Sequence, residues 1–560
     1  MIVGLAMTMT PILRSSQMDN ALVPLLLLSA LPVAHAAYEM GWYAGDMLKA
    51  PKPRNYVILL ADDTGYGDFG ATGHPTIQTP HVDRLYREGL RLSRWYSPNP
   101  ICSPARGSLM TGRYCSRWGG DHNGNAQGVF EPYMSGGLPP NETTLANLAS
   151  AAGIRTAAVG KWHLGINAEN ATDCRYCPTQ SGGFDHFFGS PFSNCGGCKE
   201  GSFKEMQSRS FLYANATIME QPIDYTNLSN RFADFAVDFI ETSVRAEERF
   251  FLYYSFFHNH VDLFASPPYA NRSLRGAYGD NVEEMDGEIG AVLAALDRLG
   301  VSEETLVMFT SDNGAWRSEQ LWGGSNGLFK AGKLQTWEGG IREPGVAWWP
   351  GVVKPGSRSS IAVNSIDMWH TLADFEDSNI DGVPRDGTSL RPLLLGECSE
   401  ELRTRPMFHY IGTTVQAASL GPYKAHWHTQ DCSGSSRPAV ACADGGNSKA
   451  WDPPLLFNVE EDPAEEFPLC APYCHGQVVM DGTKEAACPG HTSLPASECG
   501  ALRDRFEAAK AAHLEGLWYP PTQQKGNETA LIPCCNPPAC CCGPACVPPN
   551  KATYVSYNYL

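Results

Sequence analysis

The sequence predicts an α/β fold with a mostly parallel central sheet flanked by helices, followed by a smaller C-terminal antiparallel sheet domain. First, short apolar runs alternate with helical patterns between residues 55 and 375, which is typical of parallel sheets with crossover helices. Second, each apolar run ends in polar residues, as expected where such sheets bind ligands beyond the carboxyl ends of their strands. Third, short strand-like segments replace this order after about residue 395.

The central sheet is expected from four apolar runs, each rich in aliphatic or aromatic residues. These runs are NYVILLADDTGYGD at 55–68, RTAAVGKWHLG at 155–165, RFFLYYSFFHNH at 249–260 and TLVMFTSDNG at 305–314. The intervening helical patterns cover residues 79–90, 141–153, 280–300 and 364–375. The third of these has apolar positions at helical spacing and a stop signal at Gly300. Residues 406–430 and 453–463 are expected to form the smaller sheet, and 501–517 a late helix.

The composition is that of a large globular protein. The chain has 560 residues, of which 43% are hydrophobic and 18% charged. This is enough for a sizeable core, divided into more than one domain. The formal net charge of −18 predicts no nucleic-acid partner, because the sequence contains no stripe of lysine and arginine to reverse it. The net charge does not exclude small anionic substrates, since a local cluster of basic residues inside a pocket can bind them.

Residues 1–36 are predicted to be a signal peptide. Arg14 precedes the apolar run Ala21–Ala34, and small residues follow for cleavage near Ala36. A membrane anchor is the alternative, but 14 residues with two prolines fall short of the roughly 20 that span a bilayer. We therefore expect no stable membrane insertion after cleavage. The predicted domains are 37–395 (catalytic α/β), 396–530 (α+β) and a cysteine- and proline-rich tail at 531–560.

Two further features favour the secretory route. Six N-x-S/T sequons occur, at Asn141, Asn170, Asn215, Asn227, Asn271 and Asn527. The 19 cysteines fit an oxidising compartment, and 18 could pair if Cys102 is set aside. Two C-x-x-C pairs, at Cys174/Cys177 and Cys195/Cys198, are compatible with zinc but favour disulfides in a secreted chain.

Cys102 is the most informative cysteine. It stands before Pro104 and Arg106 at an expected helix start, and Gly112 suits the end of that helix. A thiol at a helix N-terminus beside an arginine would have a lowered pKa and be reactive. The alternative is a disulfide with Cys115, and the residues alone leave both readings open.

Four oxygen donors, Asp62, Asp63, Asp312 and Asn313, follow two of the expected strands. Carboxylate and amide oxygens suit Ca²⁺ or Mg²⁺ rather than zinc. An aspartate pair after a strand is more often a turn or a helix cap. The second donor pair at another strand end favours a metal site instead.

The stretch CSPARGSLMTGR, residues 102–113, resembles the C-x-P-x-R…TGR motif of the formylglycine-dependent type I sulfatases, and the surrounding chain resembles their arylsulfatase A branch. The resemblance covers Asn55 to Pro468. It is carried further by ADDTGYGDFG, GKWHLG, FFGSPFSN, TSDNG, GKLQTWEGGIREP and PPLLFNVEEDP. It implies an alkaline-phosphatase-like fold, hydrolysis of sulfate monoesters of the arylsulfatase type, and one bound Ca²⁺.

The resemblance also implies that Cys102 is oxidised to formylglycine by a formylglycine-generating enzyme during secretion. A hydrated aldehyde is a geminal diol, of which one hydroxyl attacks sulfur while the second allows sulfate to be eliminated. A serine would keep the sulfate as a stable ester. The implied metal ligands are Asp62, Asp63, Asp312, Asn313 and the modified Cys102.

Further catalytic roles follow from the same resemblance. Arg106 would hold the aldehyde hydrate and brace the metal carboxylates. Lys161 would contact the sulfate, and His163 would take a proton from the second hydroxyl. His260 would bind sulfate and protonate the leaving group, with His258, placed on the same strand face, as its competitor.

Two positions complete the implied set. Lys333 would also grip the sulfate, with Lys330 as its competitor. Ser193 aligns with a serine near the nucleophile. No tryptophan or tyrosine is assigned to substrate binding.

The expected substrate is a small or terminal sulfate ester, in an extracellular or lysosome-like compartment, and a homo-oligomer is compatible with the sequence. The sequence does not identify the leaving group, because aryl, glycolipid and polysaccharide sulfates would present the same anion to the site. One alternative is a phosphonate or phosphate ester hydrolase on the same fold. Another is an inactive sulfatase-like extracellular binding protein, which the completeness of the polar positions opposes.

Overall fold

The computed structural model describes residues 51–120, 128–193, 210–378, 382–430, 448–470, 494–526 and Leu531, together with the backbone of two short strands at 473–474 and 477–478. The chain divides into residues 1–52 and a second unit, Pro53–Leu560, which is the one described below. Several predicted features lie outside the described residues: the signal segment 1–36, the pair Cys195/Cys198, the sequon at Asn527 and the tail from residue 532.

Five parallel strands form the centre of a ten-stranded sheet, in the order β9-β1-β8-β4-β5. Their bounds are β1 Asn55–Ala61, β4 Arg155–Lys161, β5 His186–Ser190, β8 Phe250–Ser255 and β9 Thr305–Ser311. All seven residues of β1 and all seven of β9 are buried, which explains why these strands read as continuous apolar runs rather than as alternating ones.

The edges of this sheet are mixed. β11 is antiparallel to both β9 and β2, and on the other side β6 and β7 continue antiparallel from β5. The edge strands are β2 Leu90–Leu92, β6 Leu212–Ala214, β7 Thr217–Glu220, β11 Val346–Trp348 and β12 Ser357–Ser359. A separate three-stranded sheet joins β3 Trp95–Tyr96, β10 Arg342–Glu343 and β13 Val363–Asn364.

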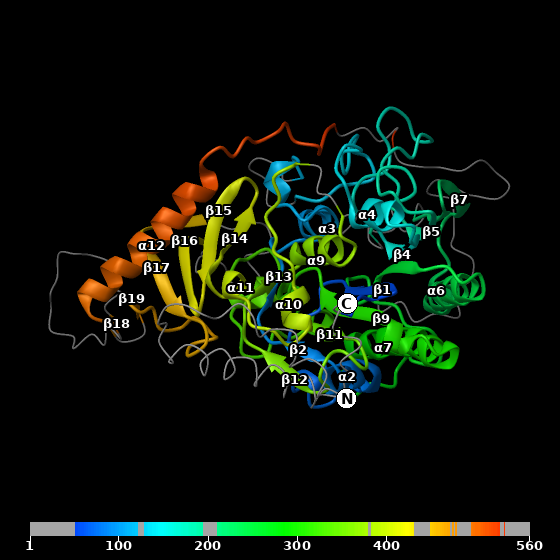
Figure 1. The fold of residues 1–560 in the computed structure, drawn as a ribbon, viewed down its shortest axis with the longest axis horizontal. Coiled ribbons are helices and arrows are strands. Elements are labelled where there is room, and N and C mark those ends of the chain that lie inside the picture. Colours follow the sequence, from blue (N-terminus) through cyan, green and yellow to red (C-terminus); the bar gives the residue numbers. More distant parts are fainter. Residues whose placement is uncertain are drawn as a thin grey trace, which may run out of the picture. The chain divides into compact units, whose positions relative to one another are not determined.

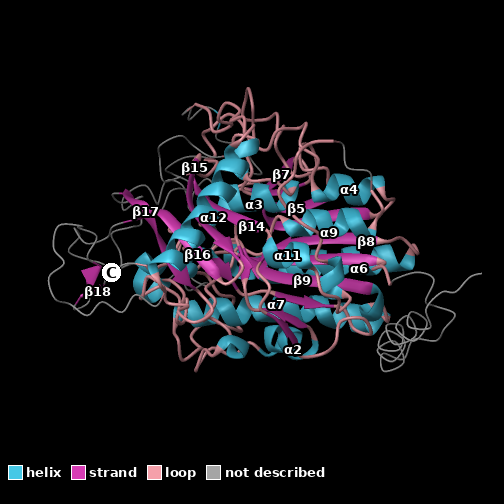
Figure 2. Cartoon of the chain, turned by 60° about the vertical axis from the view of Figure 1, so that its left-hand side comes forward, coloured by secondary structure: helices cyan, strands magenta, loops and turns pink. Residues whose placement is uncertain are grey.

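Helices cover both faces of the large sheet (Figure 2). Along β1, Tyr56, Ile58 and Leu60 pack into one hydrophobic cluster and Val57 and Leu59 into the other. The first cluster includes α3 Cys102–Thr111, α4 Leu145–Ala151 and α9 Asp367–Phe375. The second includes α2 Pro80–Glu88, α6 Leu228–Arg245 and α7 Ala277–Leu299. Period-two alternation thus places β1 between two layers of helices.

The remaining elements are short. They are the helices α8 Glu338–Ile341, α10 Arg391–Leu394 and α11 Glu400–Thr404, the 3-10 turns η1 Gly70–Thr72, η2 Cys115–Arg117, η3 Tyr225–Asn227, η4 Ser302–Glu304 and η5 Arg317–Trp322, and the strand pair β18 Tyr473–Cys474 and β19 Gln477–Val478.

The C-terminal part is a four-stranded antiparallel sheet in the order β14-β15-β16-β17, with α12 packed on it (Figure 1). Its elements are β14 Pro406–Ile411, β15 Thr414–Leu420, β16 Tyr423–Gln430, β17 Ser448–Asn458 and α12 Ala496–Leu514. A disulfide joins Cys470 to Cys499 and so fastens the chain after β17 to the first turn of α12. The segment after α12 runs back to the part that holds the large sheet, where Gln523 N donates to Gly119 O at 2.8 Å.

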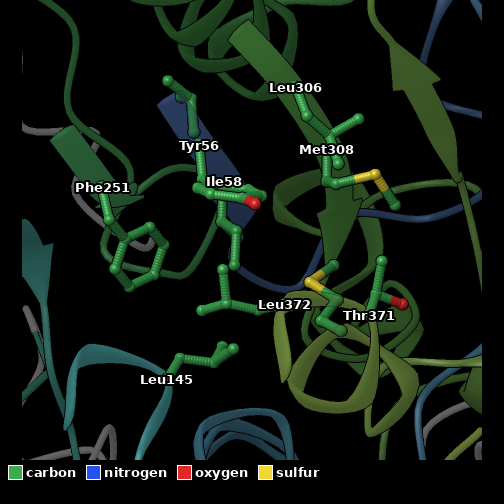
Figure 3. A pocket seen from close by; sticks show the side chains of 10 residues that line it. Tyr56, Ile58, Leu145, Phe251, Leu306, Met308, Thr371 and Leu372 are labelled. Atoms are coloured by element: carbon green, nitrogen blue, oxygen red, sulfur yellow. The ribbon is translucent and has the colours of Figure 1, made fainter. Parts of the chain in front are cut away.

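A small apolar cavity of about 30 Å³ lies between β1, β8 and β9 and the helices α4 and α9. In Figure 3 the side chains of Ile58 and Met308 face those of Leu145 and Leu372 across it. Because it holds about one water volume and its lining is almost wholly apolar, this cavity is a packing defect and not a candidate active site.

The predicted fold class is confirmed: the central strands are parallel and the C-terminal sheet is antiparallel. The 18-residue helix α6 was not among the expected helices. Within the described residues, no helix combines the length and apolar composition needed to cross a bilayer. The predicted boundary between residues 395 and 396 stays a prediction.

Candidate active site

Polar side chains from the carboxyl ends of parallel strands meet at one edge of the large sheet. Asp62 and Asp63 follow β1, Asp312 and Asn313 follow β9, and Lys161 is the last residue of β4. Asp63 N donates to Asp312 Oδ1 at 3.2 Å, and all five side chains are buried. The two acidic pairs expected from separate strands therefore form one cluster.

Cys102 is the first residue of α3 and lies against this cluster. Its Sγ is 3.8 Å from Asp62 Oδ1 and 3.6 Å from Lys161 Nζ, and Lys161 Nζ is 2.6 Å from Asp62 Oδ2. The helix ends at Gly112, whose φ of 66° lies in the left-handed region that favours glycine. The helix start and stop predicted from the sequence are confirmed.

The expected lowering of the Cys102 pKa is wrong for the unmodified thiol. Burial raises the pKa of Cys102 to about 12, against the opposing effect of the ammonium groups of Lys161 and Lys333. Removal from water thus outweighs the nearby positive charge. The structure also lacks the alternative disulfide to Cys115, because the Cys115 thiol donates to Asn99 Oδ1 at 3.2 Å. Burial therefore disfavours the thiolate form of the unmodified side chain.

Arg106 lies one turn of α3 after Cys102 and is fully buried. Its Nε and Nη2 lie 2.9 and 2.8 Å from Asp312 Oδ2, and Nη2 lies 3.3 Å from Asp62 Oδ1. Its Nη1 donates to Ser255 Oγ at the end of β8. Arg106 thus ties the ends of three strands to the helix that carries Cys102, which stabilises the ionised carboxylates.

Asp63 has its own set of partners. Lys333 Nζ lies 2.7 Å from Asp63 Oδ2, and Asn313 Nδ2 donates to Asp63 Oδ1 at 2.8 Å. Burial opposes ionisation of Asp63, but the ammonium of Lys333 holds its pKa below the ordinary value. The carboxylate is therefore ionised in the folded protein.

The donor set fits a hard divalent cation. The ligand atoms of Cys102, Asp62 and Asp312 lie within 4.8 Å of one another, as do those of Cys102, Asp63 and His260. Among the described residues, Asn313 Oδ1 is a buried oxygen without a hydrogen-bond partner, and such an atom is costly unless a ligand satisfies it. Three carboxylates and an amide oxygen are the ligands that Ca²⁺ or Mg²⁺ prefers.

Both expected histidines border this cluster. His163 follows β4, and within the described part of the chain neither of its buried ring nitrogens has a hydrogen-bond partner. Burial, with Lys161 as the next cause, lowers the His163 pKa far below its usual value. His260 Nε2 lies 3.7 Å from Asp63 Oδ2, and burial together with Lys333 also lowers its pKa strongly. Both rings are neutral at neutral pH.

The competing histidine and lysine point elsewhere. His258 Nε2 lies 3.4 Å from Glu284 and its Nδ1 3.3 Å from Glu288, on the α7 side of the sheet. The expectation that His258 shares a strand face with His260 is wrong, because β8 ends at Ser255. Lys330 Nζ donates to Glu465 O at 3.3 Å, whereas Lys333 reaches Asp63.

Ser193 is buried at the end of a described segment. The preceding residue, Phe192, packs its ring edge-on against His163 at a centroid distance of 5.1 Å. This places the Ser193 backbone beside the histidine side of the cluster. Its role stays a prediction.

Two residues at the site were not expected from the sequence. Ser255, the last residue of β8, accepts the Arg106 hydrogen bond, and its position at the end of an apolar strand was a usable signal. Trp316, four residues after Asp312, has its ring 4.1 Å from Lys333 Nζ and 5.5 Å from the His260 ring. Its position in the sequence does not distinguish Trp316 from a tryptophan of the hydrophobic core.

A buried ion network connects the Lys333 segment to the C-terminal sheet. Lys424 Nζ, on β16, lies 2.9 Å from Glu338 Oε1 at the start of α8 and 3.1 Å from Glu465 Oε1. Glu465 in turn accepts from the backbone N–H of Glu338 at 2.6 Å and lies 2.7 Å from His426 Nε2. Because breaking one buried partner is strongly destabilising, this network fixes α8 and the chain leading to it.

Comparison with protein families gives two matches that cover most of the chain. Residues 54–377 match the family described as sulfatase, and residues 402–542 match the C-terminal region of aryl-sulfatase.

Curated relatives are similar over most of their length. The chain is 35% identical to steryl-sulfatase of Rattus norvegicus, covering 86% of this chain and 92% of the relative. It is 35% identical to arylsulfatase A of Homo sapiens, covering 88% and 96%. It is 38% identical to N-acetylgalactosamine-6-sulfatase of Canis lupus familiaris, covering 75% and 82%.

Solved structures share the fold. The PsFucS1 sulfatase from Pseudoalteromonas sp. superposes with a TM-score of 0.65 at 24% identity, over 89% of this chain and 96% of that one. The phosphonate monoester hydrolase SpPMH from Silicibacter pomeroyi superposes with a TM-score of 0.54 at 16% identity, over 83% and 96%.

Proposed function

The chain belongs to the sulfatase family and is a sulfuric ester hydrolase, and we propose that it acts on small or terminal sulfate esters through a formylglycine made from Cys102 and one bound calcium ion. The observation that carries this proposal is the position of the Cys102 sulfur, whose distance to the ligand atoms of Asp62 and Asp312 is within 4.8 Å. A nucleophile built on that carbon would adjoin both the cation site and the lysines.

Position 102 becomes a nucleophile only after modification. In the conversion, which a formylglycine-generating enzyme catalyses, Cβ is oxidised by two electrons: its bond to sulfur breaks, the sulfur leaves as hydrogen sulfide, a carbonyl oxygen takes its place, and molecular oxygen accepts the electrons. The hydrated aldehyde supplies a geminal diol, which permits attack on sulfur and later release of sulfate. The raised thiol pKa supports this reading, because the unmodified side chain is a poor nucleophile at neutral pH.

The cation site would be formed by Asp62, Asp63, Asp312 and Asn313. Bound Ca²⁺ would draw electron density from sulfate oxygens and favour the ionised hydroxyl at position 102. The unpartnered Oδ1 of Asn313 and the ionised Asp63 support this ligand set.

Two lysine side chains, Lys161 and Lys333, bind the sulfate group of the substrate. Lys161 and Lys333 stand at opposite carboxylates of the cluster, 2.6 Å from Asp62 and 2.7 Å from Asp63. Both are buried, so their charges act in a medium that screens them less than water does. They orient the sulfate and stabilise the charge that grows as the ester bond breaks.

The two histidines move protons. Neutral His163 has unpartnered ring nitrogens among the described residues, so it can accept a proton from the second hydroxyl at position 102. His260 Nδ1 contacts the Val261 carbonyl and so carries the one proton of the neutral ring, which leaves Nε2 to take the proton that the attacking hydroxyl at position 102 releases and to pass it to the leaving oxygen. As one hydroxyl oxygen bonds to sulfur, the S–O bond to the alcohol breaks and the alcohol leaves with that proton. His163 then removes the proton of the second hydroxyl, the C–O bond to the sulfate breaks, and sulfate leaves as the aldehyde re-forms.

A first test is mass spectrometry of the tryptic peptide that carries position 102, taken from protein made in a eukaryotic secretory host. The expected mass is that of the aldehyde or its hydrate. An unmodified or disulfide-linked cysteine would remove the mechanism. C102A should fold and lose turnover, and C102S should retain a covalent sulfate that is detectable by mass.

A second test separates sulfate from phosphate chemistry. The likeness to a phosphonate monoester hydrolase shows a shared fold alone, whereas the curated relatives at 35% identity are sulfatases. We expect faster turnover of nitrophenyl sulfate than of nitrophenyl phosphate. The opposite ranking would reject the proposed substrate class.

We also propose that the protein works in the secretory pathway, in an extracellular or lysosome-like compartment. The motif of the modifying enzyme, the N-terminal apolar run and the sequons support this location. Fractionation of cells that express the full chain tests it, and recovery of unglycosylated enzyme in the cytosol would contradict it.

A further inference from the structure

A second cavity lies away from the active site, between the chain that follows α3 and the segment that follows α12. Its volume is about 470 Å³, which is within the range of small-ligand sites. One wall contains Arg113, Arg117 and Trp118, and the facing wall contains Trp518 and Gln523. In Figure 1 the facing wall belongs to the orange-to-red segment beyond α12.

The two arginines of the cavity wall already have carboxylate partners. Arg113 Nη1 lies 2.5 Å from Glu142 Oε1, and Arg117 Nη2 lies 2.6 Å from Asp386 Oδ1. An anion would therefore have to compete with carboxylates that are in place. The cavity suits a neutral, polar ligand.

The chemistry of that ligand follows from the side chains that line the cavity. Trp518 is 72% exposed, and an indole ring presents a flat apolar face that solvent does not satisfy. The amide of Gln523 lines the same cavity. A sugar ring matches both side chains, because its C–H face packs on an indole while its hydroxyl and acetamide groups bond to an amide.

The sugar can come from the wall itself. Asn141 is exposed, lines the cavity and begins the sequon Asn141-Glu142-Thr143. The sequon lies in the loop just before α4. An attached glycan would thus start at the cavity mouth and would not need to be captured from solution.

We propose that the N-glycan on Asn141 docks its first sugars in this cavity, with the ring stacked on Trp518. The docked glycan joins the segment after α12 to the catalytic part. That segment is otherwise fastened by backbone contacts such as Gln523 N to Gly119 O at 2.8 Å. The proposal depends on the secretory route proposed above and not on the sulfatase chemistry.

The test is site-specific release of glycans by peptide-N-glycosidase, read by mass spectrometry on the native protein. We expect the Asn141 glycan to be released about tenfold more slowly than the glycans on Asn170 and Asn271. After denaturation, the glycans of all three sites should be released at the same rate. W518A should abolish the protection and W518F should keep it.

A matched pair tests the mechanical role. T143A removes the sequon and T143S keeps it, so only T143A should raise the hydrogen-exchange rate of residues 516–526, by about tenfold. All variants should keep wild-type turnover of nitrophenyl sulfate, which separates this proposal from the catalytic one. An unoccupied Asn141 in the wild type, or equal native release at Asn141 and Asn271, would overturn the proposal.

Discussion

Arg106 contacts one oxygen of Asp312 with two nitrogens, at 2.9 and 2.8 Å, from the second turn of the helix that begins at Cys102. Both side chains are buried. Nε donates the hydrogen bond and Nη2 adds an ion pair to the same oxygen, so the contact combines direction with charge. This contact therefore helps to hold the helix that carries Cys102 against the carboxylates of Asp312 and Asp62.

Replacing Arg106 with lysine should reduce kcat for nitrophenyl sulfate by about a hundredfold or more. A lysine keeps the charge but cannot reach Asp312, Asp62 and Ser255 together. R113K, whose parent arginine pairs with Glu142 outside the site, is the control and should stay within about twofold of wild type. Equal loss in both variants would indicate a general effect on folding.

Calcium should bind through Asn313. N313A removes the unpartnered oxygen and should weaken calcium binding, measured by calorimetry, by about tenfold or more. N313D retains an oxygen at the same place and should keep binding. If removal of calcium by a chelator leaves kcat unchanged, the proposed metal role is wrong.

Trp316 should shape the site for the leaving group. Its ring packs against Lys333 and His260, so a flat leaving group next to the sulfate would adjoin it. W316A should raise KM for nitrophenyl sulfate by about threefold to thirtyfold, while W316F keeps most of the contact. A KM unchanged in W316A would place the leaving group elsewhere.

His513 should make the C-terminal sheet sensitive to acid. Its ring stacks on Phe408, and burial lowers its pKa to about 4, helped by Arg117 and opposed by Asp386. The unfolded chain takes up this proton near pH 6.5. The contribution of His513 to the free energy of unfolding is therefore fully present above that pH. It is lost as the pH falls towards 4, by up to about 3 kcal/mol.

Denaturant unfolding at pH 7 and pH 4.5 checks this expectation. The free energy of unfolding should decrease more on acidification in wild type than in H513Q, which has no group that titrates here. H428Q, at a less buried histidine of β16, is the control and should behave like wild type. The same pH dependence in wild type and H513Q would contradict the assignment.

The sequence was sufficient for the parts of the site that depend on topology. The proximity of Asp62 and Asp312 could be predicted because each follows an apolar run, and parallel strands end at the same edge of a sheet. The parallel pairing of β1 with β9 confirms that the two strands end at the same edge. The choice of Lys333 over Lys330 came from family resemblance, since both spacings suit an irregular segment.

Other features needed three-dimensional packing. The helix Leu228–Arg245 was missed although its apolar face is buried against the sheet. The Cys102 pKa depends on how much solvent the fold removes, which no local pattern states. Trp316 reaches Lys333 only because the chain after Asp312 returns over the site.

Cys102 is 1% exposed in the folded chain, and this sets a temporal order for maturation. A modifying enzyme is itself a protein and cannot insert its own catalytic groups into so closed a space. Under the proposed chemistry it must reach the nascent polypeptide while α3 is still unformed, before the C-terminal sheet and Glu465, which follows it, have been synthesised and hold α8 in place. A variant that folds too quickly would thus leave the ribosome well structured and permanently inert.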